Sequence, residues 1–201
     1  MKDVEDGILI APFYLVCDES QSMEGPKIDA CNTTIYKTLS SIAVDPTLNN
    51  IVRIGVISFS DTAQVLLPIS KMTDVDNFPG LVAEGGTNYG NAFTCLKNTI
   101  QTDIPDLRKS GAKVYRPIVM FITGSEPTDT NWKAAHAQVA DKSWPFSPHI
   151  ISFGVGGAQA DTIREVATQV DKKGKSFAYL ADDNADPGAV LTEIFRELIN
   201  S

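Results

Sequence analysis

The stretch FYLVCDESQSM (residues 13–23) indicates both the fold and the site of this chain. It begins with an apolar run long enough for one buried strand and continues into one carboxylate and two hydroxyls, those of Asp18, Ser20 and Ser22. In an open α/β sheet, functional side chains gather beyond the carboxyl ends of the strands. Oxygen donors of these types are the ligands that Mg²⁺, Mn²⁺ and Ca²⁺ prefer. The stretch therefore predicts a divalent-cation site at the end of the first strand.

Strand and helix patterns alternate outward from this stretch. The predicted strands cover residues 8–17, 52–58, 63–67, 117–123, 149–153 and 177–180. The predicted helices cover residues 27–43, 89–100 with an extension to 107 left open, 131–142, 161–170 and 187–199, and residues 75–82 are ambiguous. The pattern predicts a single α/β domain over residues 1–201, with its core at about 8–199, as a three-layer, doubly wound, mostly parallel six-stranded sheet. The strand at 63–67 follows a turn and is predicted to be an antiparallel edge strand.

Composition narrows the class of protein. The chain has 201 residues, 43% of them hydrophobic and 21% charged, which suits one globular domain with a substantial core. The net charge of −8 and the pI of about 4.7 argue against nucleic acid or an anionic membrane as the main partner. No apolar stretch is long enough to span a membrane, and residues 1–17 do not fit an export signal, so we expect a cytoplasmic protein. Three cysteines without a C-x-x-C spacing are expected to be buried apolar residues: Cys17, Cys31 and Cys95.

Two later loops are also rich in oxygen donors, and both are expected at the same edge of the sheet. The first is the loop Gly85-Gly86-Thr87-Asn88, and the second is the segment TGSEPTD at residues 123–129. An apolar strand followed by Asp-x-Ser-x-Ser, a Gly-Gly-Thr loop and a strand closing in Thr-x-x-Glu-Pro-Thr-Asp resembles the von Willebrand factor A domain. The likeness covers the chain from about residue 8 to residue 199. Within that family the order looks most similar to small bacterial cytosolic proteins of the TerY type, which are linked to tellurite resistance.

This resemblance implies a metal-ion-dependent adhesion site and a role without catalysis. Asp18, Ser20 and Ser22 match the family's first motif, and Thr87 matches the threonine that completes the site. The resemblance further implies bound Mg²⁺, or Mn²⁺ or Ca²⁺, and a partner protein that presents a carboxylate to the metal, in a bacterial stress-response system. The family's fifth position, an aspartate at the end of the fourth strand, falls on Gly124, which implies a weak site. Three neighbouring acidic residues are candidates to compensate: Glu19, Glu126 and Asp129.

Two alternatives remain open from the sequence. The first is a metal-free scaffold whose adhesion site is degenerate because of Gly124. The second is a Mg²⁺-dependent phosphatase similar to the haloacid dehalogenases, with Asp18 as nucleophile, Thr123 at the end of a later strand and the pair Asp182-Asp183 helping to hold the metal. Against the second alternative, Ser20 stands where such enzymes carry another aspartate, and the phosphatase pattern leaves Ser22 and Thr87 unexplained.

Overall fold

The computed structural model describes residues 7–75, 78, 80–168, 174, 176–181 and 186–199, with the side chains of 187, 190 and 197–199 excepted. Six strands of its sheet follow the order β3-β2-β1-β5-β6-β7, and a seventh, β4, pairs with the start of β1. The strands are β1 (Leu9–Asp18), β2 (Val52–Phe59), β3 (Ala63–Lys71), β4 (Lys113–Val114), β5 (Ile118–Thr123), β6 (His149–Gly154) and β7 (Ala178–Leu180). All pairs are parallel except β2 with β3, which confirms the mostly parallel sheet with an antiparallel hairpin strand.

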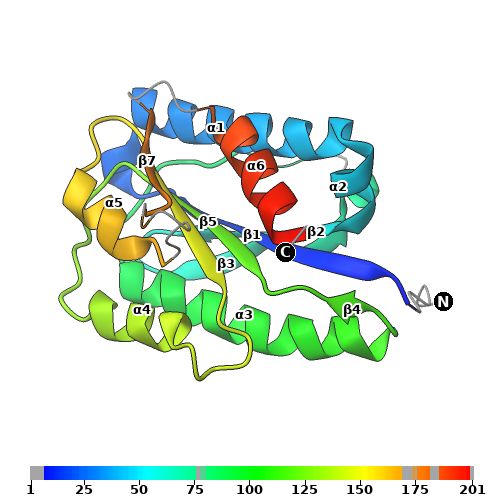
Figure 1. Ribbon diagram of the computed structural model, residues 1–201. Helices are drawn as coiled ribbons and strands as arrows, with labels where there is room; N and C mark the ends of the chain where they lie inside the picture. The colour runs from blue at the N-terminus through cyan, green and yellow to red at the C-terminus, as the bar shows by residue number, and fades with distance from the viewer. Residues whose placement is uncertain are drawn as a thin grey trace.

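Helices cover both faces of the sheet, so the molecule has the expected three layers (Figure 1). The helices are α1 (Pro26–Val44), α2 (Pro46–Ile51), α3 (Tyr89–Lys109), α4 (Trp132–Ala140), α5 (Ala160–Val166) and α6 (Pro187–Ile199), with 3₁₀ turns η1 (Gln21–Met23) and η2 (Met72–Asp74). In Figure 1, α1, α2 and α6 lie above the sheet, and α3 and α4 lie below it. Within the described residues, no helix combines the length and the apolar character that crossing a membrane requires.

Two short elements were not predicted. The expected six-stranded sheet gains β4 because Lys113 and Val114 pair with Leu9 and Ile10, and two residues are too few to give a strand pattern. Helix α2 follows α1 closely, in a segment where no helix was predicted. Asp45 ends α1 there and also caps α2, since its Oδ1 accepts hydrogen bonds from the backbone of Thr47 at 3.0 Å and Leu48 at 3.1 Å.

The other boundaries differ little from those predicted. Helix α3 takes the longer of its two predicted lengths and continues past Pro105 to Lys109. Helix α5 ends at Val166, and the predicted end at residue 170 lies outside the described residues. The ambiguous segment 75–82 contains no helix in its described part, residues 75, 78 and 80–82.

The central strands are buried on both sides, as their continuous apolar sequences predict. Successive residues of β1 enter opposite clusters: Phe13 and Leu15 pack toward α1 and α6, and Tyr14 and Val16 toward α3 and α4. The second cluster is rich in rings, with Phe93 stacked on Phe121 at a centroid distance of 5.1 Å. Tyr89, the first residue of α3, packs on Phe59 of β2 and Phe121 of β5, so the start of the helix lies against these two strands.

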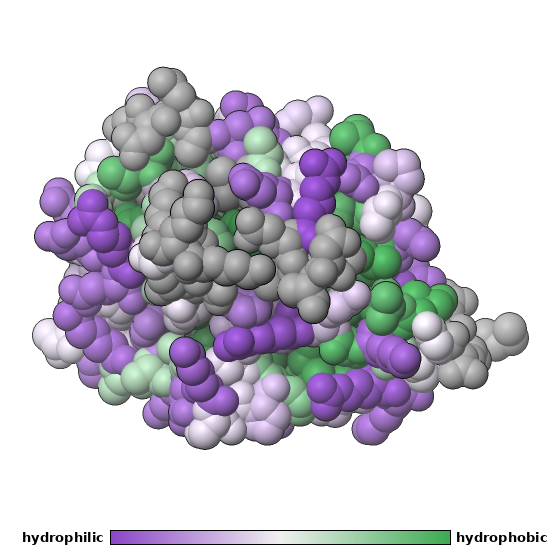
Figure 2. All heavy atoms as spheres, viewed as in Figure 1, coloured by the Kyte–Doolittle hydropathy of each residue, from purple (hydrophilic) through white to green (hydrophobic). Residues whose placement is uncertain are grey.

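The outer surface is mostly polar, as Figure 2 shows for one face. On that face apolar residues gather near the start of β1, where Ile8 and Leu9 are each about two-fifths exposed. The cysteines are all free. Cys17 and Cys31 are buried as predicted, whereas Cys95 is only half-buried.

Candidate metal centre

Asp18 is the last residue of β1 and is fully buried. Its Oδ1 accepts a hydrogen bond from the backbone N–H of Ser20 at 2.9 Å, and its Oδ2 accepts one from the Thr123 hydroxyl at 2.6 Å. The first bond turns the chain as it leaves the strand, and the second joins the ends of β1 and β5. Each carboxylate oxygen can accept a further bond, because it carries two lone pairs.

Four hydroxyls converge beside this carboxylate. Ser22 Oγ lies 3.0 Å from Ser20 Oγ, 3.5 Å from Thr87 Oγ1 and 2.6 Å from the Oγ of Ser125. Ser20 Oγ and Ser125 Oγ are 3.4 Å apart. Ser20, Thr87 and Ser125 are buried, whereas Ser22 is exposed, so the cluster opens to solvent on one side. The structure therefore brings together all four residues predicted from the sequence and adds Ser125.

Backbone hydrogen bonds hold the loop after β1 against the glycine loop. The N–H of Gln21 donates to the carbonyl of Gly85 at 2.8 Å, and the N–H of Glu84 donates to the carbonyl of Glu19 at 2.8 Å. Gly85 has φ +74°, a left-handed conformation that glycine adopts without strain. These bonds place Thr87 beside the Asp-x-Ser-x-Ser turn.

The backbone beyond β6 passes close to Gly124, the position at which the resemblance expects the family's aspartate. The N–H of Val155 donates to the carbonyl of Thr123 at 2.9 Å, which extends the pairing of β5 and β6 by one residue. A Cβ at position 124 would lie 2.8 Å from the carbonyl oxygen of Val155, closer than such atoms approach each other. A side chain is therefore excluded at this position without a backbone shift.

Ser125, the residue after Gly124, places its hydroxyl in the cluster. Sequence reasoning placed Ser125 in an oxygen-rich loop but did not assign it to the site. The sequence signal for Ser125 was its hydroxyl, directly after the position that lacks a carboxylate. The direction of that side chain depends on how the loop leaves β5, which the sequence does not show. Here the Tyr89 hydroxyl donates to the Ser125 carbonyl at 2.6 Å, and the Ser125 N–H donates to Thr123 Oγ1 at 3.2 Å.

Two of the three candidate carboxylates point elsewhere. Glu126 accepts a hydrogen bond from the Thr162 hydroxyl of α5 at 2.7 Å. Asp129 caps α3, with its two oxygens accepting from the N–H groups of Tyr89 at 2.9 Å and Gly90 at 3.0 Å. Neither carboxylate makes a hydrogen bond to the hydroxyl cluster.

The third candidate, Glu19, is half-buried, and the described residues include no hydrogen bond from its carboxylate to the hydroxyls. A carboxylate that sequence reasoning did not consider, that of Asp61, lies against the glycine loop. A Cβ added at Gly86 would lie 2.5 Å from Oδ1 of Asp61, a residue in the turn between β2 and β3. Among these carboxylates, Asp18 is the one with hydrogen bonds to both the Ser20 backbone and the Thr123 hydroxyl.

The phenol of Tyr89 lies beside the hydroxyl cluster, bonded to the Ser125 carbonyl, and stays protonated. Burial raises the pKa of Tyr89 well above its usual value, the Thr123 hydrogen bond lowers it, and the charge of Asp18 raises it further. Tyr89 is fully buried and packs edge-to-face on Phe59 and Phe121. It is thus a fixed hydrogen-bond donor that orients the loop after β5.

The spacing of the hydroxyls suits a hard cation. Around an octahedral ion with metal–oxygen distances of about 2.1 Å, neighbouring ligand oxygens lie about 3.0 Å apart, and at about 2.4 Å they lie about 3.4 Å apart. The observed separations of 2.6–3.5 Å span this range. The charge of the donor set is small, however, because it includes a single carboxylate. No group of three or more His, Cys, Asp or Glu side chains suited to a metal occurs in the described part of the chain.

The phosphatase alternative depends partly on residues that cannot be placed. Asp182 and Asp183 lie outside the described residues. Among the described residues of this alternative, the Thr123 hydroxyl donates a hydrogen bond to the Asp18 carboxylate. Ser20 lies two residues after Asp18, and its backbone N–H donates to the same carboxylate. These contacts give Thr123 and Ser20 a role in orienting the carboxylate.

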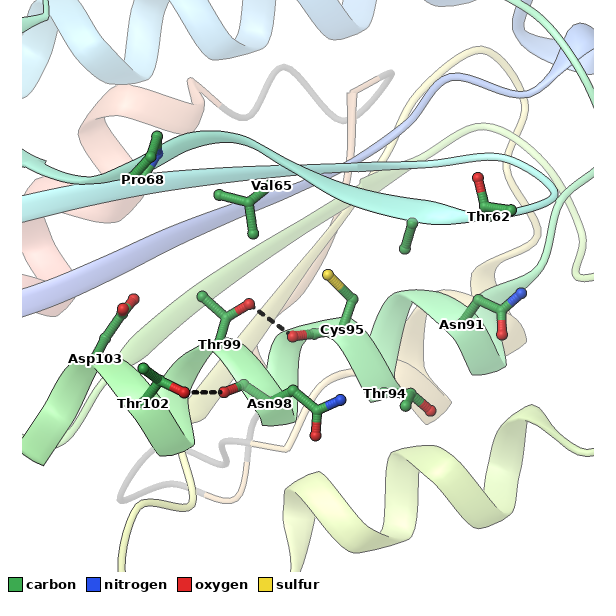
Figure 3. Close-up of a pocket in the computed structure, with 11 residues that line it drawn as sticks. Thr62, Val65, Pro68, Asn91, Thr94, Cys95, Asn98, Thr99, Thr102 and Asp103 are labelled. Atoms are coloured by element: carbon green, nitrogen blue, oxygen red, sulfur yellow. Dashed lines mark hydrogen bonds between the residues drawn. The ribbon is translucent and has the colours of Figure 1, made fainter.

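A separate groove begins beside these loops and follows α3. This groove of about 680 Å³ runs between β3 and α3, and Figure 3 shows its lining side chains. The helix contributes mainly neutral polar residues, among them Thr94, Asn98 and Thr102, and one carboxylate, Asp103. Burial raises the pKa of Asp103, while the hydrogen bond from the Tyr14 hydroxyl lowers it. The groove has no cluster of converging hydroxyls such as the one at the strand ends.

Comparisons with known proteins agree with this geometry. A sequence model of the von Willebrand factor type A domain matches residues 13–126. A search of curated proteins found no match.

Solved structures share the fold at low sequence identity. Proximal thread matrix protein 1 from the mussel byssus superposes with a TM-score of 0.64 at 14% identity, covering 94% of this chain and 48% of that one. The present chain thus spans about half the length of the mussel protein. BatB from Bacteroides thetaiotaomicron gives 0.59 at 18% identity, covering 95% of this chain and 100% of that one. The VWA domain of SpRpn10 gives 0.61 at 11% identity, covering 92% and 95%.

A further structure of the mussel protein is described as having a zinc-occupied MIDAS motif, the metal-ion-dependent adhesion site. It superposes with a TM-score of 0.57 at 16% identity, covering 88% of this chain and 42% of that one. At such identities these likenesses show the fold. Because the family match covers more than half of the 201 residues and includes the Asp-x-Ser-x-Ser turn, the chain belongs to the von Willebrand factor type A domain family.

Proposed function

We propose that this domain is a non-enzymatic protein-binding module whose adhesion site takes a divalent cation. The residues that would hold the ion are Asp18, Ser20, Ser22, Thr87 and Ser125. The observation that carries the proposal is the convergence of four hydroxyls from three loops, with separations of 2.6–3.5 Å. Convergence of this kind is a poor arrangement for packing alone, because it concentrates polar groups at one point.

The charge of the site suggests how a partner is recognised. Affinity for a hard cation rises with the number of charged ligands, and this donor set offers only Asp18. The ion, when bound, would supply positive charge and an open coordination position at the exposed Ser22 side. A carboxylate from the partner protein would complete the site. Mg²⁺ is the expected ion. Mn²⁺ or Ca²⁺ could take its place, because both also prefer oxygen ligands.

The resemblance to TerY-like proteins suggests a setting for this module. The partner would then be another component of a bacterial, cytoplasmic stress-response system related to tellurite resistance. This part of the proposal rests on motif order alone. It would be tested by capture of partners from bacterial lysate with and without chelator.

A metal-free scaffold is the second candidate, and one observation favours it. The backbone of Val155 leaves no room for the family's aspartate at position 124, so the site has lost a charge that it cannot easily regain. A scaffold would use the same edge of the sheet for contacts that need no ion.

Calorimetric titration of chelator-stripped protein with Mg²⁺, Mn²⁺ and Ca²⁺ distinguishes the two candidates. Asp18→Ala is expected to weaken binding at least about 100-fold, or about 2.8 kcal/mol, because it removes the only carboxylate of the donor set. Asp106→Ala is the matched control, since this exposed carboxylate pairs with Lys109 at 3.7 Å near the far end of α3. Thermal unfolding in chelator checks that each variant keeps its fold.

Either of two results would overturn the proposal. Absence of heat at millimolar metal would favour the scaffold, and equal binding by Asp18→Ala would place the ion elsewhere. Hydrolysis of a chromogenic phosphate ester that Asp18→Asn abolishes would instead establish the phosphatase alternative.

A further inference from the structure

A lysine contacts the backbone of Gly124, the residue at the position of the family's missing carboxylate. The Nζ of Lys27 donates to the carbonyl of Gly124 at 2.9 Å. That carbonyl belongs to the peptide bond leading directly to Ser125, whose hydroxyl is part of the cluster. The N–H of the same peptide donates to Thr123 Oγ1 at 3.2 Å, so the peptide links the ammonium to the network around Asp18.

The neighbouring backbone accommodates the lysine stem. A Cβ added at Gly156 would overlap Cγ of Lys27, and Gly156 has φ +57°, where a side chain is strained in any case. The glycine thus allows the loop after β6 to lie directly on the stem. Lys27 is half-buried as a result, so its charge is screened less than that of a lysine extended into water.

Its place in α1 gives an independent reason to look for a role. Lys27 follows Pro26 in the first turn of the helix, where the dipole disfavours positive charge. The N-cap, Gly25, offers no side-chain hydrogen bond to this end of the helix. Helix stability therefore does not account for a lysine here, whereas the contact with Gly124 does.

We propose that Lys27 is a resident cation that holds the metal affinity of the site low until an acidic partner arrives. This inference rests on the proposed function of the site. Asp18 contributes one negative charge to the donor set, and the positive charge of Lys27 offsets its attraction for a dication. A partner carboxylate restores the missing negative charge. Metal and partner then bind interdependently, and neither occupies the site firmly alone.

The test is calorimetric titration of Mn²⁺ into chelator-stripped wild type and three variants. Lys27→Met keeps a stem that can pack on Gly156 but removes the charge, and it is expected to bind Mn²⁺ about tenfold more tightly. Lys27→Arg keeps the charge and is expected to match the wild type. Lys109→Met removes a lysine twenty residues along α3 from Tyr89, about 30 Å away along the helix, and is expected to change the affinity less than about twofold.

The outcomes separate this inference from the proposed function. One outcome would overturn the role of Lys27 and leave the proposed function intact. In it, the wild type binds Mn²⁺, Asp18→Ala abolishes that binding, and Lys27→Met binds no more tightly than the wild type. Equal tightening by Lys27→Met and Lys27→Arg would also overturn the role of Lys27, because the charge would then not be the cause. Absence of binding in both the wild type and Lys27→Met at millimolar Mn²⁺ would overturn both proposals. Melting temperatures in chelator show whether either substitution simply loosens α1.

Discussion

The ends of β1 and β5 lie side by side at one edge of the sheet, yet they present opposite chemistry. β1 ends in a buried carboxylate, Asp18, whereas the position after β5 is Gly124, whose carbonyl accepts from an ammonium. The difference lies in the neighbour of each strand. Beyond β6, the Val155 carbonyl closes the space at position 124, whereas the Asp18 carboxylate at the end of β1 has room to accept from Ser20 and Thr123. The sheet edge thus offers an acidic ligand only where the adjacent backbone leaves room for a side chain.

Gly124→Ala is the strongest test of this difference. The added Cβ would lie 2.8 Å from the Val155 carbonyl oxygen, and overpacking of this kind is expected to lower the free energy of unfolding by about 2 kcal/mol. Gly80→Ala is the matched control, since its Cβ would meet nothing closer than 3.8 Å. Urea unfolding measures both. Equal stability of the two variants would mean that the Val155 backbone yields readily and that contact does not explain Gly124.

Ser125→Ala tests whether the residue after Gly124 contributes an oxygen to metal binding. If Ser125 replaces the oxygen that position 124 does not supply, its loss is expected to weaken metal binding about tenfold, or about 1.4 kcal/mol. The decrease should be smaller than that for Asp18→Ala, because a neutral oxygen is removed rather than a charge. Ser70→Ala, on the edge strand β3, serves as the control in the same titration. Unchanged affinity of Ser125→Ala would exclude its hydroxyl from the metal.

The end of β2 provides a third comparison, with the smallest expected change in the free energy of unfolding. Ser58 pairs with Cys17 near the end of β2, and its hydroxyl is buried with no hydrogen-bond partner among the described residues. Because a buried unsatisfied hydroxyl costs free energy, Ser58→Ala is expected to raise the free energy of unfolding by about 1 kcal/mol.

Ser152 provides the contrast for this prediction. It is equally buried, but its hydroxyl donates to the Ile163 carbonyl, so Ser152→Ala is expected to destabilise the protein. Urea unfolding of the two variants should give changes of opposite sign. A loss of stability in Ser58→Ala similar to that in Ser152→Ala would indicate a partner for the Ser58 hydroxyl.

Local pattern was sufficient for the main elements and for part of the site. The continuous apolar run before Asp18 predicted a buried parallel strand, and the turn at 60–62 predicted the antiparallel pairing of β3, both now confirmed. The short elements were missed because β4 has only two residues and α2 depends on a cap shared with the end of α1. Thr87 entered the predicted site through the resemblance to the von Willebrand factor A domain, in which a Gly-Gly-Thr loop supplies a threonine to the site.

Taken alone, the sequence determined the fold class, the strand that carries Asp18 and the absence of a carboxylate at position 124. It could not determine which groups replace that carboxylate, because the directions of Ser125, Glu126 and Asp129 depend on contacts with distant segments. Asp129 turns to the first turn of α3, forty residues earlier in the chain, and Glu126 turns to α5. Lys27 reaches Gly124 across 97 positions of sequence. Charge at a site is a sum over neighbours in space, so the balance between Asp18 and Lys27 was decided only by the tertiary structure.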